Sequence, residues 1–285
     1  MIRLCAFADE ADERLEGQIE ALKRNGISLI ELRGIDGVNV SKLTLAEAEK
    51  YAQRLADAGI AVWSIGSPIG KVDISVDLEG YLSEVRHVCR LARIFDTERI
   101  RMFSFYGALG CEDEVIRRLR RMVEVAREEG VRLLHENEKR IFGDTLERVL
   151  RLREKVPELG LIYDPANFIE VGESAEETLE ALLPQIDYFH IKDAIAESGE
   201  IVPAGFGDGR ISELILGIGE DGDKVLTVEP HLTEFVGFDQ LDSCALKNKF
   251  AFANADEAFD AAVTALKTIL IGQGYKETEG GFIKR

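Results

Sequence analysis

The feature that most constrains the fold is an alternation of short apolar runs with longer amphipathic runs, repeated eight times. The apolar runs average about five residues and are rich in strand-forming side chains, whereas the longer runs show helical periodicity. The expected strands span Ile2–Ala8, Ile27–Leu32, Ile60–Ile65, Arg99–Phe105, Val131–Glu136, Leu159–Tyr163, Ile186–Ile191 and Val225–Glu229. The expected helices span Ala11–Arg24, Leu45–Ala58, Leu78–Phe95, Glu112–Glu129, Leu146–Lys155, Ala175–Leu183, Ile211–Ile218 and Asp256–Ile271.

This alternation predicts a closed barrel. Strands that alternate strictly with helices run parallel and are joined by right-handed crossovers. Eight repeats favour closure of the sheet over an open, doubly wound arrangement. We therefore expect an α/β protein with a single-domain (β/α)8 TIM barrel over residues 1–274 and a frayed tail over residues 275–285.

Composition excludes several classes of function. The net charge of −18, from 53 acidic and 35 basic residues, argues against a nucleic-acid surface, which would need a basic face. No run approaches the roughly 18 apolar residues of a membrane span, and the N-terminus does not resemble a signal peptide. We expect a cytoplasmic enzyme that acts on a small molecule.

Four consecutive expected strands end in side chains that can bind a metal. They are Glu136 in L-L-H-E-N-E, Asp164 in L-I-Y-D-P, His190 in Y-F-H-I-K-D and Glu229 in T-V-E-P-H. Because the carboxyl ends of barrel strands open on the active site, these four side chains are expected to converge. Three carboxylates and one imidazole suit one divalent metal, with Mn²⁺, Mg²⁺ or Co²⁺ favoured and Zn²⁺ also compatible.

Each of these residues has a simpler interpretation. Glu136 could be a surface acid at the start of a loop, and Glu138, two residues on, competes for the ligand role. Asp164 precedes a proline, and Asp-Pro pairs also start turns. A lone His190 would more often be a core histidine than a ligand. His135 should point to the opposite face of its strand from Glu136 and is expected to be packed or hydrogen-bonded.

Other polar residues near the strand ends are candidates for substrate binding. Some follow the candidate ligands directly, and others end strand 2 or follow the glycine-rich run G-F-G-D-G after strand 7, where barrels commonly bind phosphate. The candidates are Asn167, Lys192, Asp193, Arg210, His231 and Glu31. Lys192 could meet an alkoxide or a phosphate, or be solvated.

Taken together, these motifs resemble the xylose isomerase-like barrel superfamily, in its sugar phosphate isomerase/epimerase branch. The resemblance is carried by G-V-R-L-L-H-E-N, Y-D-P-A-N, F-H-I-K-D, G-F-G-D-G and V-E-P-H and covers nearly the whole chain. It implies that Glu136, Asp164, His190 and Glu229 bind one metal, and that Glu136 and Glu229 are the catalytic acid/base pair. Phe206 departs from the family, which more often has an acidic residue between the first two glycines of this loop.

The expected function is a metal-dependent isomerase or epimerase of a small keto- or aldo-sugar, or of a sugar phosphate. Proton transfer by carboxylates through a metal-stabilised enediolate would carry the reaction. A dehydratase acting on a polyol-derived ketone and a non-catalytic sugar-binding barrel are the alternatives. The related abasic-site endonucleases need more histidines than the four present here.

The segment after the last strand is long and aromatic. It runs from His231 to Asn254 and contains Phe235, Phe238, Phe250 and Phe252. A long loop at the catalytic face is often a lid or an interface. Together with the acidic exterior, this loop offers a surface for assembly into a homo-oligomer, such as a dimer or a tetramer.

Overall fold

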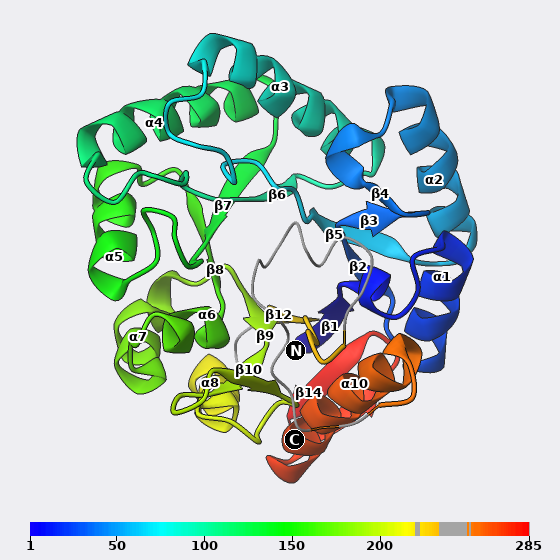
Figure 1. Ribbon diagram of the computed structural model, residues 1–285. Helices are drawn as coiled ribbons and strands as arrows, with labels where there is room; N and C mark the ends of the chain where they lie inside the picture. Colours follow the sequence, from blue (N-terminus) through cyan, green and yellow to red (C-terminus); the bar gives the residue numbers. More distant parts are fainter. Residues whose placement is uncertain (220–222, 234–249, 251, 285) are drawn as a thin grey trace.

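The computed structural model describes residues 1–219, 223–233, 250 and 252–284 (Figure 1). Within them, eight parallel strands form a closed ring, because β12 pairs with β1 as well as with β9. The ring strands are β1 (Ile2–Ala6), β2 (Leu29–Leu32), β5 (Ala61–Ile65), β6 (Arg99–Met102), β7 (Arg132–Glu136), β8 (Gly160–Tyr163), β9 (Tyr188–Ile191) and β12 (Lys224–Val228). The predicted (β/α)8 barrel is confirmed.

Helices surround the ring on its outer side (Figure 1). They are α1 (Leu15–Arg24), α2 (Leu45–Asp57), α3 (Leu78–Ile94), α4 (Glu112–Glu128), α5 (Leu146–Lys155), α6 (Pro165–Glu170), α7 (Ala175–Leu182), α8 (Ile211–Ile218) and α10 (Ala255–Gly272). Short 3-10 turns lie at η1 (Ala8–Glu10), η2 (Val40–Lys42) and η3 (Leu183–Gln185). The first helix begins at Leu15, later than the predicted Ala11, and the backbone N–H of Leu15 donates to Oδ1 of Asp36 at 2.9 Å.

Several short elements were not predicted, because two to six residues are too few to show the periodic pattern of apolar residues that identifies a helix or a strand. They include α6 and the hairpins β3 (Gly34–Ile35) with β4 (Val38–Asn39) and β10 (Asp193–Ile195) with β11 (Glu200–Val202). The start of α6 does have a local cause. Oδ1 of Asp164 caps the helix by accepting a hydrogen bond from the backbone N–H of Asn167 at 3.1 Å, and Pro165 is the first residue of the helix.

The C-terminal residues are ordered into a hairpin, and the expectation of a frayed tail is wrong. Strand β13 (Tyr275–Thr278) pairs with β14 (Gly281–Lys284), and β14 pairs antiparallel with β1 at Ile2 and Phe282. Phe282 and Tyr275 are buried. Burial of these two rings offsets the entropy cost of ordering the tail.

The barrel interior is layered. Cys5, Leu134, Ile162, Tyr188 and Val225, on five different strands, pack into a small apolar cluster. Successive residues of a strand point to opposite faces, so the residue two positions further on points into the barrel again, one layer closer to the mouth. From Leu134, Ile162 and Tyr188 this step leads to Glu136, Asp164 and His190. An apolar floor therefore lies below the candidate metal ligands.

Two sequence expectations concern other parts of the chain. Most of the aromatic segment predicted to be a lid or an interface, residues 234–249 and 251, lies outside the described residues. No helix in the described ranges has both the length and the apolar character needed to cross a membrane.

Candidate metal centre

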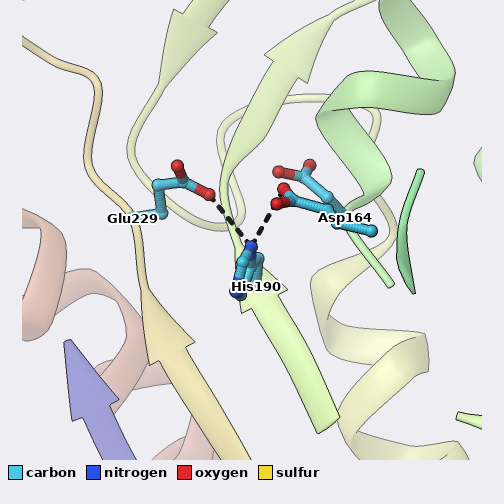
Figure 2. Close-up of side chains that lie close together, drawn as sticks. Asp164, His190 and Glu229 are labelled. Carbon is cyan, nitrogen blue, oxygen red and sulfur yellow. Dashed lines mark hydrogen bonds and ion pairs between the residues drawn. The ribbon is translucent and has the colours of Figure 1, made fainter. Parts of the chain in front are cut away.

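Four ligand-type side chains from four neighbouring strand ends meet at the mouth of the barrel. Glu136, Asp164, His190 and Glu229 each offer one atom to a group in which all these atoms lie within 4.8 Å of one another. All four residues are buried. Figure 2 shows Asp164 and Glu229 on either side of His190, with their carboxylates directed toward the same space.

The spacing of these atoms fits a single cation. Nδ1 of His190 lies 3.0 Å from Oε1 of Glu136 and 3.2 Å from Oε2 of Glu229. Ligand atoms that bind one cation through bonds of about 2.1 Å lie about 3.0 to 3.4 Å apart.

Buried oxygens without hydrogen bonds support the same assignment. Oε2 of Glu136, Oδ2 of Asp164 and Oε2 of Glu229 are buried and accept no hydrogen bond, and each lies instead beside a positive group: Arg101 at 3.2 Å, Lys192 at 2.9 Å and His190 at 3.2 Å, respectively. Buried carboxylate oxygens that are compensated by nearby charge but accept no hydrogen bond are expected at a site that binds an ion or takes part in catalysis. Each acidic residue of the group thus has one oxygen that is held by an ion pair alone, and a metal could take the place of that partner.

Glu31 lies behind the imidazole of His190, away from the other ligands. Its carboxylate is 3.1 Å from His190 Nε2 and accepts hydrogen bonds from the Tyr188 hydroxyl at 2.8 Å and the Thr227 hydroxyl at 3.0 Å. With a proton on Nε2, the lone pair of Nδ1 is left for a metal. These contacts favour a positioning role for Glu31 over the predicted contact with substrate.

Replacing Glu31 with glutamine is expected to weaken metal binding by about 10- to 100-fold. The NH₂ group of the glutamine would face the three groups that now donate to Glu31, so the imidazole of His190 would no longer be held in its orientation. Competition with a coloured chelator measures the dissociation constant. Glu138→Gln is the matched control, since Glu138 contacts Lys71 at 2.7 Å and none of the four ligands, and it should change affinity by no more than about threefold. Equal affinities in the two variants would contradict the positioning role.

The electrostatics of the group are those of a site that exchanges a proton for a metal. Burial alone would lower the pKa of His190, but the carboxylates of Glu136 and Glu31 raise it well above its usual value. Burial alone would raise the pKa of Glu136, but His190 and Arg101 lower it to about 2. Without a metal, His190 is therefore protonated between carboxylates, and a bound cation would replace that proton.

Three of the predicted substrate-binding residues lie beside the four ligands. Nζ of Lys192 is 2.9 Å from Oδ2 of Asp164 and also donates to Asn167, whose amide in turn donates to Oε1 of Glu136 at 3.3 Å. Nε2 of His231 lies 3.4 Å from Oε1 of Glu229. Asn167, Lys192 and His231 are therefore positioned where they could contact a substrate held at the centre.

Asp193 is used within the protein. Its carboxylate accepts backbone N–H groups from Ala194, Gly205, Gly207 and Gly209 at 2.8 to 3.1 Å. The G-F-G-D-G loop is thus wrapped around this carboxylate, and the amides that could have bound a phosphate are already bonded. These contacts do not favour the predicted contact of Asp193 with substrate.

Arg210 does not face the candidate ligands in any described contact. Its side chain is 41% exposed and pairs with Glu176 at 2.9 Å and Glu213 at 3.0 Å. We therefore do not assign Arg210 a role in binding a substrate anion.

His135 and Glu138, the neighbours of Glu136 in the sequence, lie outside the group of four ligands. His135 points away from the centre, as expected, and its Nε2 lies 2.9 Å from the Ser104 hydroxyl. Burial lowers the pKa of His135 to about 4, which keeps the ring neutral. Glu138, the alternative ligand, pairs with Lys71 and lies outside the group of four.

Sequence reasoning missed several charged residues around the centre. Arg101 lies within β6, Glu10 ends the 3-10 turn η1 and Lys71 lies in a loop, and the side chains of all three are buried. Arg101 could have been found from R-I-R-M, because a charge inside a strand that is covered by helices must be paired or functional.

Glu10 belongs to a second group of potential ligands, with Glu229 and His231. Arg33 contacts both of its carboxylates, at 3.0 Å for Glu10 and 3.4 Å for Glu229. A guanidinium thus already supplies positive charge to this second group.

Solved structures with a similar fold include enzymes of different reaction classes. One is the probable 3-DHS dehydratase AsbF of Bacillus anthracis, with a TM-score of 0.70 and 20% identity over 94% of this chain and 99% of that one. Another is the IolI protein with a bound zinc atom, with a TM-score of 0.69 and 17% identity over 94% and 97%. A third is an L-ribulose 3-epimerase, with a TM-score of 0.67 and 16% identity over 95% and 96%.

The search of curated proteins found no match to this chain. A family model, described as the xylose isomerase-like TIM barrel, matches residues 19–243. That range contains seven of the eight ring strands and all four residues of the candidate metal centre. The chain therefore belongs to the xylose isomerase-like TIM barrel family.

Proposed function

We propose that the protein is a divalent-metal-dependent isomerase or epimerase acting on a small keto- or aldo-sugar or its phosphate. The observation that carries the proposal is the convergence of Glu136, Asp164, His190 and Glu229, with a buried oxygen of each acid free of hydrogen bonds. Three oxygens and one nitrogen favour Mn²⁺, Mg²⁺ or Co²⁺, and Zn²⁺ is also compatible. The similarity to an epimerase structure agrees with this proposal.

Glu136 and Glu229 are proposed to move the proton. They approach the centre from β7 and the end of β12, on either side of His190 on β9, so a substrate between them would present two faces of one carbon to two carboxylates. One carboxylate would remove the proton next to the carbonyl and the other would return it. A bound divalent cation would supply Lewis-acid stabilisation of the negative charge that develops on the substrate oxygens.

Lys192, Asn167 and His231 are proposed to orient the substrate. Lys192 is a buried ammonium whose pKa burial would lower, but Asp164 and Glu229 raise it well above its usual value, so it remains charged beside the centre. A charged donor at this position can hold a substrate hydroxyl or a developing alkoxide.

A dehydratase that acts on a polyol-derived ketone is the second candidate. It needs the same removal of a proton next to a carbonyl, followed by loss of a hydroxyl group to which a neighbouring acid gives a proton. Similarity to the probable 3-DHS dehydratase favours this candidate.

Product analysis with and without metal tests the proposal. The protein is stripped with a chelator, reloaded with Mn²⁺, and incubated in D₂O with a panel of ketoses, aldoses, keto-inositols and sugar acids. Isomerisation or epimerisation that requires metal and incorporates solvent deuterium next to the carbonyl is the expected result. Loss of water would establish the dehydratase instead, and equally tight sugar binding after stripping would indicate a binding protein.

The remaining expectations concern the setting of the reaction. We propose a small-molecule sugar as the partner, a cytoplasmic location, and assembly into a homo-oligomer. Size measurement in solution tests the last of these.

A further inference from the structure

Three buried cations and two aromatic rings form a ladder beside the metal centre. The guanidiniums of Arg33 and Arg101 lie 4.4 and 4.9 Å from the ring of Phe7. Arg101 and the ammonium of Lys71 lie 5.1 and 4.4 Å from the ring of Phe103. Arg101 is therefore the middle cation of the ladder, between the two rings.

The outer cations of the ladder and Lys192 each have a carboxylate at hydrogen-bonding distance. Arg33 meets Asp9 at 2.8 Å, Lys71 meets Glu138 at 2.7 Å and Lys192 meets Asp164 at 2.9 Å. A buried charge with such a partner is expected in any folded protein. These pairs alone therefore do not indicate a ligand.

Arg101 is different. It is 2% exposed, and its nearest carboxylate oxygen is Oε2 of Glu136 at 3.2 Å, an atom that accepts no hydrogen bond. Its guanidinium donates to the Gly66 carbonyl at 3.2 Å, but Nε has no hydrogen-bond partner among the described residues. A buried cationic donor that is left unpaired is costly, so its presence calls for a further partner.

Glu136 cannot satisfy Arg101 while it also serves the candidate metal. Its Oε1 already approaches Nδ1 of His190 and the amide of Asn167. When the carboxylate ligates a cation, much of its negative charge is shared with that cation. Nε of Arg101, which has no described hydrogen-bond partner, and Nη1, which lies beside Glu136, are then the donors left for a molecule bound at the centre.

We propose that this site takes an anionic substrate, whose oxyanion group, a carboxylate or a phosphate, is bound by Arg101 with Lys71 next to it on the ladder. The inference rests on the proposed metal-dependent function and narrows its substrate class. Arg101 contacts a metal ligand, so the oxyanion lies within a few bonds of the oxygens held at the centre. A planar guanidinium binds such groups through paired N–H donors, which neutral hydroxyls do not match.

Three small probes that differ in one group test the proposal. Dihydroxyacetone is neutral, hydroxypyruvate carries a carboxylate and dihydroxyacetone phosphate carries a phosphate, and all three have the same hydroxyketone. Calorimetry on the Mn²⁺-loaded protein measures their dissociation constants. We expect at least one anion to bind about tenfold more tightly than dihydroxyacetone or better. The tighter anion identifies the group as carboxylate or phosphate.

Variants of Arg101 test whether its guanidinium, and not simply the positive charge of the site, causes the preference for an anion. The preference is the ratio of the dissociation constant of dihydroxyacetone to that of the tighter anion. In Arg101→Gln this ratio should be no more than about two. In Arg101→Lys, which keeps the charge, it should be lower than in the wild type by about threefold or more. Arg118→Gln is the matched control, because Arg118 is also buried but bonds to Glu114 and the Val76 carbonyl on the outer layer, and it should keep the full preference.

Equal binding of all three probes by the wild type would overturn the proposal, as would an unchanged preference in both Arg101 variants. If Arg101→Gln does not fold or load Mn²⁺, Arg101→Lys decides the matter. Binding is read without turnover. A protein that prefers anions but turns over no sugar would therefore reject the proposed function and leave this subsite standing.

Discussion

Glu136→Gln and Glu229→Gln are each expected to lower turnover by about a thousandfold, within the range that positioned acid/base groups contribute. Glutamine keeps the size of the side chain but cannot accept the proton, and its amide is a poorer ligand than a carboxylate. Steady-state kinetics on the substrate identified by product analysis, with metal content from elemental analysis, provides the measurement. Full activity and full metal loading in both variants would refute the assignment.

Two further variants separate proton transfer from metal binding. Asp164→Asn removes a candidate ligand that is not a proposed acid or base, so excess Mn²⁺ should restore much of its activity but little of that in Glu229→Gln. Glu138→Gln makes the same change as Glu136→Gln two residues further along, at a residue outside the group of four, and should retain most activity. Equal loss in all four variants would point to a general effect of charge at the barrel mouth.

Asp193→Ala is expected to destabilise the protein by about 4 kcal/mol, because four backbone N–H groups lose one buried, charged acceptor. Glycine is required in the loop that surrounds this carboxylate. A Cβ at Gly207 would lie 2.4 Å from Oδ1 of Asp193, and one at Gly209 would lie 2.7 Å from it. The free energy of unfolding from urea titration is the measurement.

Asp77→Ala provides the matched control for this loss. Asp77 is an exposed cap of α3 that accepts one N–H, from Gly80, so its replacement should cost only about 1 kcal/mol. The loss of unfolding free energy in Asp193→Asn should lie between those of Asp193→Ala and Asp77→Ala, since asparagine keeps one of the two accepting oxygens. If Asp193→Ala costs no more than Asp77→Ala, the carboxylate does not hold the loop together.

Much of the fold could be predicted because its signals are local and repeated. Eight apolar runs, each followed by an amphipathic run, are compatible with few topologies. The hairpin β13–β14 was missed because its stability comes from pairing with β1, about 280 residues away along the chain. Residues this far apart leave no periodic trace in the sequence.

The four candidate ligands could be proposed because each occupies the same place in its repeat, at the end of a strand. The roles of their neighbours could not. Glu31 and Asp193 look alike in the sequence, as acids that end or follow strands, yet one lies behind His190 and the other is wrapped by glycine amides. Arg101 lies within a strand and looks like part of the scaffold until its side chain is seen beside Glu136.

The sequence by itself determined the barrel, the order of its strands and the residues that stand at their ends, because alternation and periodicity are properties of neighbouring residues. Only the tertiary structure decided which charges face one another. Pairing energies depend on distances of a few ångströms between side chains that are far apart along the chain, and burial makes those energies large. Closure of the ring brings Arg101, Glu136 and His190 together and decides which of their polar atoms remain for a metal and a substrate.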